Sequence, residues 1–293
     1  MKNQKTEKEI FVFIANIKSG GFDKEEFQKK IELYLKPDQY KIYYTENKEV
    51  SQQIIEQNIN QRIVLVGGDG TISGAIQSLV KFNKSFSIIP AGTSNVLCKE
   101  LNISEELDEN LKKIIYNPEE YKIDLIKTDK KYFILMTGIG YDGLIVKMVK
   151  LQGHKFLKKI VHIFYGFYAA IVYRNKKIKL KINGNEYVYK NLLIGNCKKY
   201  AGNFNLFYQA KNNDGIMDII AFKEWNFFIA ALVVLFILFN KFSYLKNFFD
   251  YYQTERCEIE YLSNDIEIQV DGDYCFEKLT YFECVKEAIN IIR

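Results

Sequence analysis

The stretch RIVLVGGDGTISGAI, residues 62–76, decides the fold of the first half of the chain. An apolar run over residues 63–66 ends in the segment GGDGT, residues 67–71, and a helical pattern resumes at Ile72. This pattern predicts a buried strand, a tight glycine turn and a helix N-terminus. Glycine lets a backbone come close to a ligand, and the start of a helix offers unpaired N–H groups to an anion. The stretch is therefore either a phosphate cradle or an ordinary strand-to-helix turn of an α/β domain.

Length and composition indicate a globular protein of one large domain or two ordinary ones. The chain has 293 residues, of which 48% are hydrophobic and 26% charged. Its five cysteines are scattered and form no CxxC pair, so neither a disulfide framework nor a zinc site is indicated. Residues 1–10 lack the apolar core of a signal peptide. These features predict a cytoplasmic location.

Strands and helices alternate in the first part of the chain. Strands are expected at residues 10–17, 41–44, 63–66 and 86–89, and helices at 23–35, 48–59, 72–82, 95–101 and 105–116. Polar glycine turns follow three of these strands. The alternation predicts a parallel sheet with helices on both faces. Ligands bind such sheets beyond the carboxyl ends of the strands, where these turns would converge.

The rhythm changes after about residue 121. Strands are expected at residues 121–127, 132–137, 178–182, 187–194, 217–222, 257–261 and 265–270. Most are joined by short turns, which predicts an antiparallel sandwich or barrel. The predicted division is a first domain at 1–122, a second at 123–278, and a C-terminal segment at 279–293 that could return to the first.

Two helical insertions, at residues 143–173 and 225–252, are expected in the second half. The span 143–185 contains ten Lys and Arg residues and no acid. The second insertion contains thirteen residues without a polar side chain, 227–239, too few for the roughly 20 that span a bilayer. That helix is either buried in the core or lies in a membrane interface. Because no nucleic-acid motif accompanies the charge, an anionic membrane is the favoured partner.

Six motifs in sequence order resemble those of the diacylglycerol kinase catalytic-domain family, specifically its soluble bacterial lipid kinases related to sphingosine kinases. They are NIKSG at 16–20, GGDGT at 67–71, PAGTSNVL at 90–97, GIGYD at 138–142, NDGIMD at 213–218 and VDGD at 270–273. Ile17 replaces the proline of the family's NPxSG turn, and Asp273 replaces the glutamate of its VDGE ending. GGDGT alone is shared with NAD kinases and phosphofructokinases, but a kinase of a soluble substrate would need neither the later motifs nor the apolar helix.

The resemblance implies a Rossmann-like N-terminal α/β domain, similar to those of NAD kinases and phosphofructokinases, and a C-terminal antiparallel β-sandwich with helical insertions. It implies an ATP-dependent kinase that phosphorylates a lipid hydroxyl, with diacylglycerol, converted to phosphatidic acid, as the first candidate. A sphingoid base or another lipid is the alternative substrate, and a catalytically impaired lipid- or membrane-binding protein is the alternative in another class. The implied partners are the lipid and an anionic membrane surface, bound peripherally. Nucleic acid is not implied, and a homodimer stays open.

The resemblance also implies which residues contact the nucleotide. They are Asn16, Thr45, Gly67, Gly68, Asp69, Gly70, Thr71, Ile72, Ser73, Gly92, Thr93 and Asn95. Asp69 would reach phosphate through Mg²⁺, because two negative groups repel and Mg²⁺ bridges phosphates. A turn-stabilising role is the alternative for Asp69, and Asn95 either caps the following helix or lies near the site.

Two further sites are implied in the second half. A second, structural Mg²⁺ would be held by the carboxylate of Asp214 and the carbonyls of Lys211 and Ile216, although the segment also reads as a plain turn. The general base would be Asp273, which is one methylene shorter than the family's glutamate. Asp271 is the second candidate, expected on the same strand.

Overall fold

The computed structural model describes residues 9–152, 169, 173 and 176–293. The chain forms two compact units. The first contains the described residues up to Lys122 together with Ile289–Arg293, and the second contains Ile123–Ala288. The last strand, β18 (Tyr281–Ile292), begins in the second unit and ends in the first.

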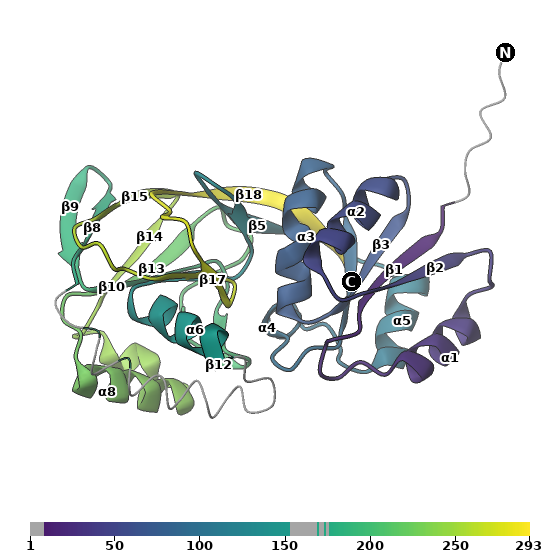
Figure 1. Ribbon diagram of the computed structural model, residues 1–293, viewed down its shortest axis with the longest axis horizontal. Helices are drawn as coiled ribbons and strands as arrows, with labels where there is room; N and C mark the ends of the chain where they lie inside the picture. Colours follow the sequence, from purple (N-terminus) through teal and green to yellow (C-terminus); the bar gives the residue numbers. More distant parts are fainter. Residues whose placement is uncertain (1–8, 153–168, 170–172, 174–175) are drawn as a thin grey trace, which may run out of the picture. The chain divides into compact units, whose positions relative to one another are not determined.

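The first unit is a parallel sheet flanked by helices (Figure 1). Its elements are β1 (Phe11–Asn16), α1 (Lys24–Tyr34), β2 (Tyr40–Thr45), α2 (Lys48–Gln57), β3 (Arg62–Gly67), α3 (Asp69–Lys81), β4 (Phe86–Pro90), α4 (Val96–Glu100) and α5 (Leu107–Tyr116). The strands run in the order β2-β1-β3-β4, and each neighbouring pair is parallel. Ile291 of β18 pairs with Phe86, which adds the chain's end beside β4.

Strand alternation explains how this sheet is covered on two sides. Phe11, Phe13 and Ala15 point to one face, where they pack in a single cluster with residues of α1 and α5. Helices α2 and α3 contact each other and cover the opposite face (Figure 1). With helices on both faces, the sheet offers a ligand only its ends, and the order reverses between β1 and β3. That reversal marks the carboxyl ends of β1 and β3 as the place where a ligand would bind.

The second unit is built mainly from antiparallel strands. Its elements are β5 (Glu120–Thr128), β6 (Tyr132–Phe133), β7 (Met136–Ile139), α6 (Tyr141–Gln152), β8 (Ile178–Ile182), β9 (Asn185–Tyr189), β10 (Asn191–Gly195), β11 (Lys199–Tyr200), β12 (Phe204–Asn205), β13 (Met217–Phe222), α8 (Phe227–Leu238), the 3₁₀ helix η1 (Phe242–Leu245), β14 (Asp250–Thr254), β15 (Arg256–Tyr261), β16 (Ile268–Val270), β17 (Asp273–Cys275) and most of β18. One sheet has the order β14-β13-β10-β7-β16-β17, and all its pairs are antiparallel.

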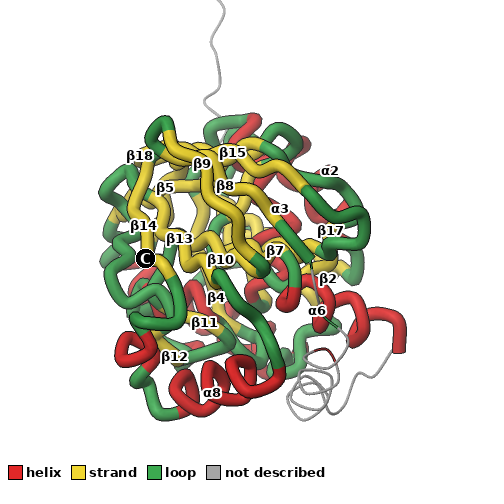
Figure 2. Tube along the Cα trace, turned by 90° about the vertical axis from the view of Figure 1, so that its left-hand side faces the viewer, coloured by secondary structure: helices red, strands yellow, loops and turns green. Residues whose placement is uncertain are grey.

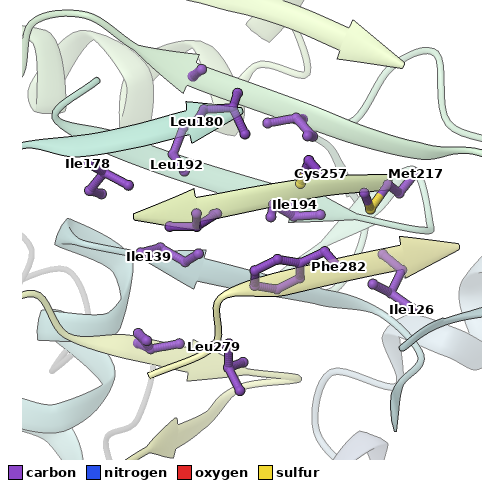
Figure 3. Packing of buried hydrophobic residues seen from close by; sticks show 14 of the residues in the cluster. Ile126, Ile139, Ile178, Leu180, Leu192, Ile194, Met217, Cys257, Leu279 and Phe282 are labelled. Atoms are coloured by element: carbon purple, nitrogen blue, oxygen red, sulfur yellow. The ribbon is translucent and has the colours of Figure 1, made fainter. Parts of the chain in front are cut away.

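The second sheet of this unit faces the first across a shared apolar core. It contains β18, β15, β8 and β9, joined by antiparallel pairing, and also β5, which pairs with β18 and with β6. Ile139 and Ile194 from one sheet meet Leu180 and Phe282 from the other in one buried cluster (Figure 3). The predicted fold class, a parallel α/β part followed by an antiparallel sandwich with helical insertions, is therefore confirmed.

Several predicted boundaries were wrong, for identifiable reasons. The apolar run at 187–194 is two strands, because the chain passes from one sheet to the other at Lys190. The run at 132–137 crosses between the sheets in the same way, from β6 to β7. Helix α3 begins at Asp69 and not at Ile72, so the glycine turn is shorter than expected. The alternation of apolar residues is the same in both sheets. The sequence pattern therefore does not show where the chain crosses from one sheet to the other.

Of the two predicted helical insertions, the second is only partly helical and the first is described only in part. The second was expected to run to residue 252, but α8 ends at Leu238 and residues 250–254 form β14, paired with β13. Of the first insertion, α6 is described, whereas Lys155, Lys158 and Lys159 lie outside the described residues. In the part of the chain that the structure describes, no helix is long and apolar enough to cross a membrane.

Candidate functional site

Three polar turns meet at the carboxyl ends of β1, β3 and β4. Asn16, the last residue of β1, donates a hydrogen bond from Nδ2 to Oγ1 of Thr71, at 3.1 Å. The backbone N–H of Gly21 donates to the carbonyl of Ala91, at 3.0 Å. These bonds join turns that are far apart in the sequence. The structure therefore brings together the first three motifs at the strand ends where a ligand was expected.

Gly68 and Gly92 are required where two of these turns touch. A Cβ on Gly68 would lie 2.9 Å from the Cα of Gly92. A Cβ on Gly92 would lie 2.5 Å from the Cα of Gly68 and 2.7 Å from Oδ1 of Asn95. Since real Cβ atoms do not approach backbone so closely, any side chain at either position would push the turns apart.

The N-terminus of α3 opens onto this group of turns. Its N-cap residue is Gly68, which has no side chain, and no side chain caps the helix. The first N–H groups of a helix attract anions through their donors and the helix dipole. Gly70 lies in this first turn, and a Cβ built on it would meet nothing within 4 Å. The arrangement suits the approach of a phosphate group to the backbone.

Asp69 holds the neighbouring helix in place. Its Oδ2 accepts from the N–H of Val96 at 3.0 Å, and its Oδ1 accepts from the N–H of Leu97 at 3.1 Å. The carboxylate therefore caps α4, which is the structural role that the sequence left open. Each oxygen keeps a further lone pair, so contact with a phosphate through Mg²⁺ stays a prediction.

Asn95 is the N-cap residue of α4 by position, but its side chain does not cap that helix. Its Oδ1 accepts from the N–H of Gly92 at 3.0 Å, and its Nδ2 donates to the Gly92 carbonyl at 3.1 Å and to Glu105 at 3.1 Å. Its backbone is left-handed, with φ of 45°, a conformation that asparagine tolerates. Asn95 thus fixes the turn beside Gly68, whereas Asp69 does the capping.

Three other residues predicted to contact the nucleotide differ in how accessible their side chains are to a ligand. Thr45 is buried, with Oγ1 3.2 Å from Oγ of Ser51. Ile72 is buried too, so only its backbone could serve a ligand. Thr93 is exposed, and its Oγ1 lies 3.4 Å from a Cβ built on Gly20. Thr93 therefore borders the turns from the solvent side.

In the second unit, Asp271 stabilises a junction between strands. Its Oδ1 accepts from the N–H groups of Leu135 and Met136 at 2.9 and 3.0 Å, and its Oδ2 accepts from Ile134 at 3.1 Å. It does not lie on a strand as expected, because Asp271 and Gly272 form the turn of the β16–β17 hairpin with φ of 50° and 82°. The buried carboxylate thus has a structural role, which is to join the hairpin to residues 134–136.

Asp273 differs from Asp271 in its exposure to solvent. It is exposed and is the first residue of β17, paired with Val270 across the hairpin. The next residue, Tyr274, donates to Oε2 of Glu267 at 2.5 Å, and Lys147 of α6 pairs with Oε1 at 2.7 Å. Burial alone would raise the pKa of Glu267, but these hydrogen bonds outweigh it and hold the pKa below its ordinary value. The hairpin is thereby fastened to α6.

Both carboxylate oxygens of Asp142, in the fourth motif, accept hydrogen bonds from other side chains. It is buried at the start of α6, where its Oδ1 accepts from the hydroxyl of Tyr200 at 2.9 Å and its Oδ2 accepts from Nε2 of Gln269 at 2.7 Å. Both oxygens thus join α6 to neighbouring segments of the same unit. These contacts give Asp142 a structural role.

Three carboxylates lie at the NDGIMD motif: Asp214 and Asp218 belong to it, and Asp124 lies beside it. Asp214 accepts from the N–H of Ile216 at 3.1 Å, and buried Asp124 accepts from the N–H of Gly215 at 2.6 Å. Burial raises the pKa of Asp218 to about 6, against hydrogen bonds from Tyr251 and Gln253 that lower it. Burial likewise raises the pKa of Asp124, and the charge of Asp214 raises both values.

This acidic group fits a hard cation. Oδ2 of buried Asp218 has no hydrogen-bond partner, an arrangement that costs free energy unless another group compensates it. Among the described residues, no three His, Cys, Asp or Glu side chains converge to hold a metal ion, so a cation here would need backbone carbonyls. Asp124 was missed as part of this group. An acid inside the apolar strand 123–126 was the available signal.

A hollow of about 650 Å³ lies elsewhere, on the outer surface of β8, β15 and β18. Lys181 and Glu260 line it. Nζ of Lys181 lies 3.7 Å from Oε2 of Glu260, and both residues belong to a row of ion pairs on the surface. None of the predicted site residues lines this hollow. Its opposite charges are already paired, so we assign it no function.

Comparison with known proteins agrees with these motifs. The family model for the diacylglycerol kinase catalytic domain matches residues 10–128. A diacylglycerol kinase of Mycobacterium tuberculosis is 23% identical over 245 residues, 79% of this chain and 76% of that protein. One of Bacillus subtilis is 22% identical over 223 residues, 72% of this chain and 71% of that protein. A crystal structure of a diacylglycerol kinase from Bacillus anthracis superposes with a TM-score of 0.73 at 20% identity, covering 98% of both chains.

Proposed function

We propose that the chain is a member of the diacylglycerol kinase catalytic-domain family, whose model matches residues 10–128, and that it transfers the γ-phosphoryl group of ATP to a lipid hydroxyl. Diacylglycerol is the proposed substrate and phosphatidic acid the product. The convergence of three glycine-containing turns on the N-terminus of α3 is the observation that carries this proposal.

The nucleotide would bind at these turns in the first unit. The N–H groups at the start of α3 would donate to phosphate oxygens, and the open space beside Gly70 would let the phosphates approach the backbone. Asn16 and Thr93 would border the nucleotide from neighbouring turns. When bound, Mg²⁺ neutralises charge on the phosphates. We propose that Asp69 faces that ion while it continues to cap α4.

Asp273 is the proposed general base. The lipid oxygen attacks the γ-phosphorus, the bond from that phosphorus to the β–γ bridging oxygen breaks, and ADP leaves with the bond's electron pair. Asp273 accepts the proton that the lipid hydroxyl loses. Exposure leaves this carboxylate accessible, whereas three backbone N–H groups already occupy Asp271.

A second cation is proposed in the second unit. The carboxylate of Asp214 and the carbonyls of Lys211 and Ile216 would hold it, and the uncompensated oxygen of Asp218 supports a positive charge nearby. Its role would be structural, since it would offset the mutual repulsion of the neighbouring carboxylates. No step of the reaction depends on it.

The protein would meet its substrate at an anionic membrane in the cytoplasm. Ten Lys and Arg residues without an acid in the span 143–185 support attraction to anionic lipids. The five cysteines are buried and form no disulfide with one another, which suits a reducing compartment. Binding would be peripheral.

Phosphate transfer from labelled ATP to a panel of lipids in mixed micelles, with Mg²⁺, tests the proposal. The wild type is compared with Asp273→Asn and with Gly68→Val, which places side-chain atoms against Gly92. Asp265→Asn is the matched control, because it removes a charge from another exposed acid of the same unit, one whose side chain is 84% exposed. We expect label in diacylglycerol, lost in the first two variants and kept in the control.

Other outcomes would redirect the proposal. Label in a sphingoid base would change the substrate and keep the reaction. ATP binding without transfer to any lipid would favour a catalytically impaired lipid- or membrane-binding protein. A wild type that does not bind ATP would refute the nucleotide site itself.

A further inference from the structure

Helix α8 has an unusual composition for a helix at a protein surface. Its twelve residues, FFIAALVVLFIL, include no side chain that can form a hydrogen bond. A surface helix in water normally carries polar residues on its outer side. A helix that is apolar all round is normally enclosed by other apolar groups.

Among the residues that the structure describes, packing buries one side of α8. Ala230 and Val233 are its buried residues. The large residues that stay exposed, here called the outer face of α8, are Phe227, Phe228, Leu235, Leu238 and the adjoining Phe239. At 3.6 residues per turn these five lie on one side of the helix, opposite Ala230 and Val233. Phe228 is 81% exposed and Phe239 67%, and α8 runs along the outside of the second unit in both views (Figures 1 and 2).

Length and charge indicate what would cover the outer face. Twelve residues span about 18 Å, much less than the roughly 30 Å hydrocarbon core of a bilayer. The segment 225–249 contains no acid but has two lysines, Lys241 and Lys246, both exposed just beyond the helix. Tyr244 and Phe248, between and beside these lysines, are exposed as well. Apolar residues bordered by lysines and aromatic rings match the interface of an anionic bilayer.

We propose that the outer face of α8 enters the interface of an anionic lipid bilayer, with α8 lying in the membrane plane and Lys241 and Lys246 at the head groups. The inference rests on the proposed function only in that a lipid kinase meets its substrate in a bilayer. The inference identifies α8 as the element that contacts the membrane. The basic run 143–185 indicates attraction to anionic lipids but does not identify such an element.

Flotation of the full chain with vesicles tests the inference without ATP or phosphate transfer. The vesicles are phosphatidylcholine with or without phosphatidylglycerol. The double variant Phe228→Ser/Leu235→Ser removes two exposed side chains and should bind about a hundredfold more weakly, roughly tenfold for each. Lys241→Ala/Lys246→Ala should bind about thirtyfold more weakly to anionic vesicles and like wild type to neutral ones.

The matched control is Leu33→Ser, which removes an apolar side chain that is 71% exposed on α1, in the other unit. It should bind vesicles like wild type. Phosphorylation of a short-chain diacylglycerol dissolved below its micelle concentration should be unchanged in all variants. This second assay reads the proposed function separately, so either idea can fail alone.

Three results would overturn the inference. They are a wild type that does not float with anionic vesicles, a double variant that floats like wild type, and a loss of flotation in Leu33→Ser equal to that of the double variant. Light scattering distinguishes a further alternative. A dimer that the double variant turns into a monomer, with flotation unchanged, would make the outer face of α8 a subunit interface instead.

Discussion

The variant Asp271→Asn should lose about 2–4 kcal/mol of unfolding free energy, whereas Asp273→Asn should change it by less than about 0.5 kcal/mol. The two acids are two residues apart in the sequence, yet only Asp271 is buried against backbone donors. An asparagine keeps one oxygen, which can still accept from Leu135 and Met136. Its NH₂ group would then face the N–H of Ile134.

The expected loss of unfolding free energy follows from this one lost hydrogen bond, in which two donors, the asparagine NH₂ and the N–H of Ile134, face each other. A hydrogen bond to a charged group contributes about 1.5–3 kcal/mol, and a buried donor left without a partner costs about 1–3 kcal/mol. The two overlap, since the same N–H is involved, so their sum is an upper bound. For a domain of this size the loss corresponds to a fall in Tm of roughly 5–15 °C. The left-handed backbone at this position adds no cost, since asparagine tolerates it.

Urea unfolding followed by circular dichroism measures the stability of both variants, and phosphate transfer at a temperature where both are folded measures turnover. We expect Asp271→Asn to be destabilised but active, and Asp273→Asn to be stable with turnover reduced about 10²- to 10⁴-fold. The opposite pattern, a stable but inactive Asp271→Asn beside an active Asp273→Asn, would refute the reasoning and move the base to Asp271.

Four further predictions concern individual residues. Asp69→Asn should lower the unfolding free energy by about 1 kcal/mol through the weakened cap and should raise the Mg²⁺ concentration for half-maximal turnover; an unchanged requirement would contradict the proposed metal contact. Gly92→Ala should destabilise by about 1–3 kcal/mol in urea, whereas Gly70→Ala should fold normally and weaken ATP binding by calorimetry. Mg²⁺ should raise the Tm of the wild type but not of Asp214→Asn. The lowered pKa of Glu267 contributes stability above about pH 4 that is lost on acidification, so urea midpoints of Glu267→Gln should fall less steeply below pH 4.

Local sequence patterns predicted the structure correctly where residues close together in the sequence determine it. The strand, glycine turn and helix around GGDGT were predictable because burial, backbone freedom and helix initiation all act within about ten residues. The convergence of the turns also followed, since parallel strands place their carboxyl ends at one edge. What the residues of those turns bond to could not be read in this way. Asp69 reaches Val96 and Leu97, which follow it by 27 and 28 residues.

Asp271 illustrates the same limit more sharply. In the sequence, Asp271 and Asp273 are two acids of one short motif, and chemistry alone does not separate them. The difference arises from three backbone N–H groups at residues 134–136, more than 130 positions away. Because a backbone donor leaves no mark on residue type, no sequence pattern could have shown that Asp271 is already occupied.

Helix α8 poses a different problem, since its sequence contains too little contrast. In a helix with a polar and an apolar side, the sequence indicates which side is buried. Twelve apolar residues in succession give no such indication. A core helix and an interface helix therefore look identical in sequence. Only tertiary packing separates the two, because it covers Ala230 and Val233 and leaves Phe228 and Leu235 in contact with solvent. In the part of the chain that the structure describes, this face stays exposed, so an apolar layer that removed its side chains from water would stabilise it. An anionic bilayer supplies both the apolar layer for that face and the charge for the lysines that follow it.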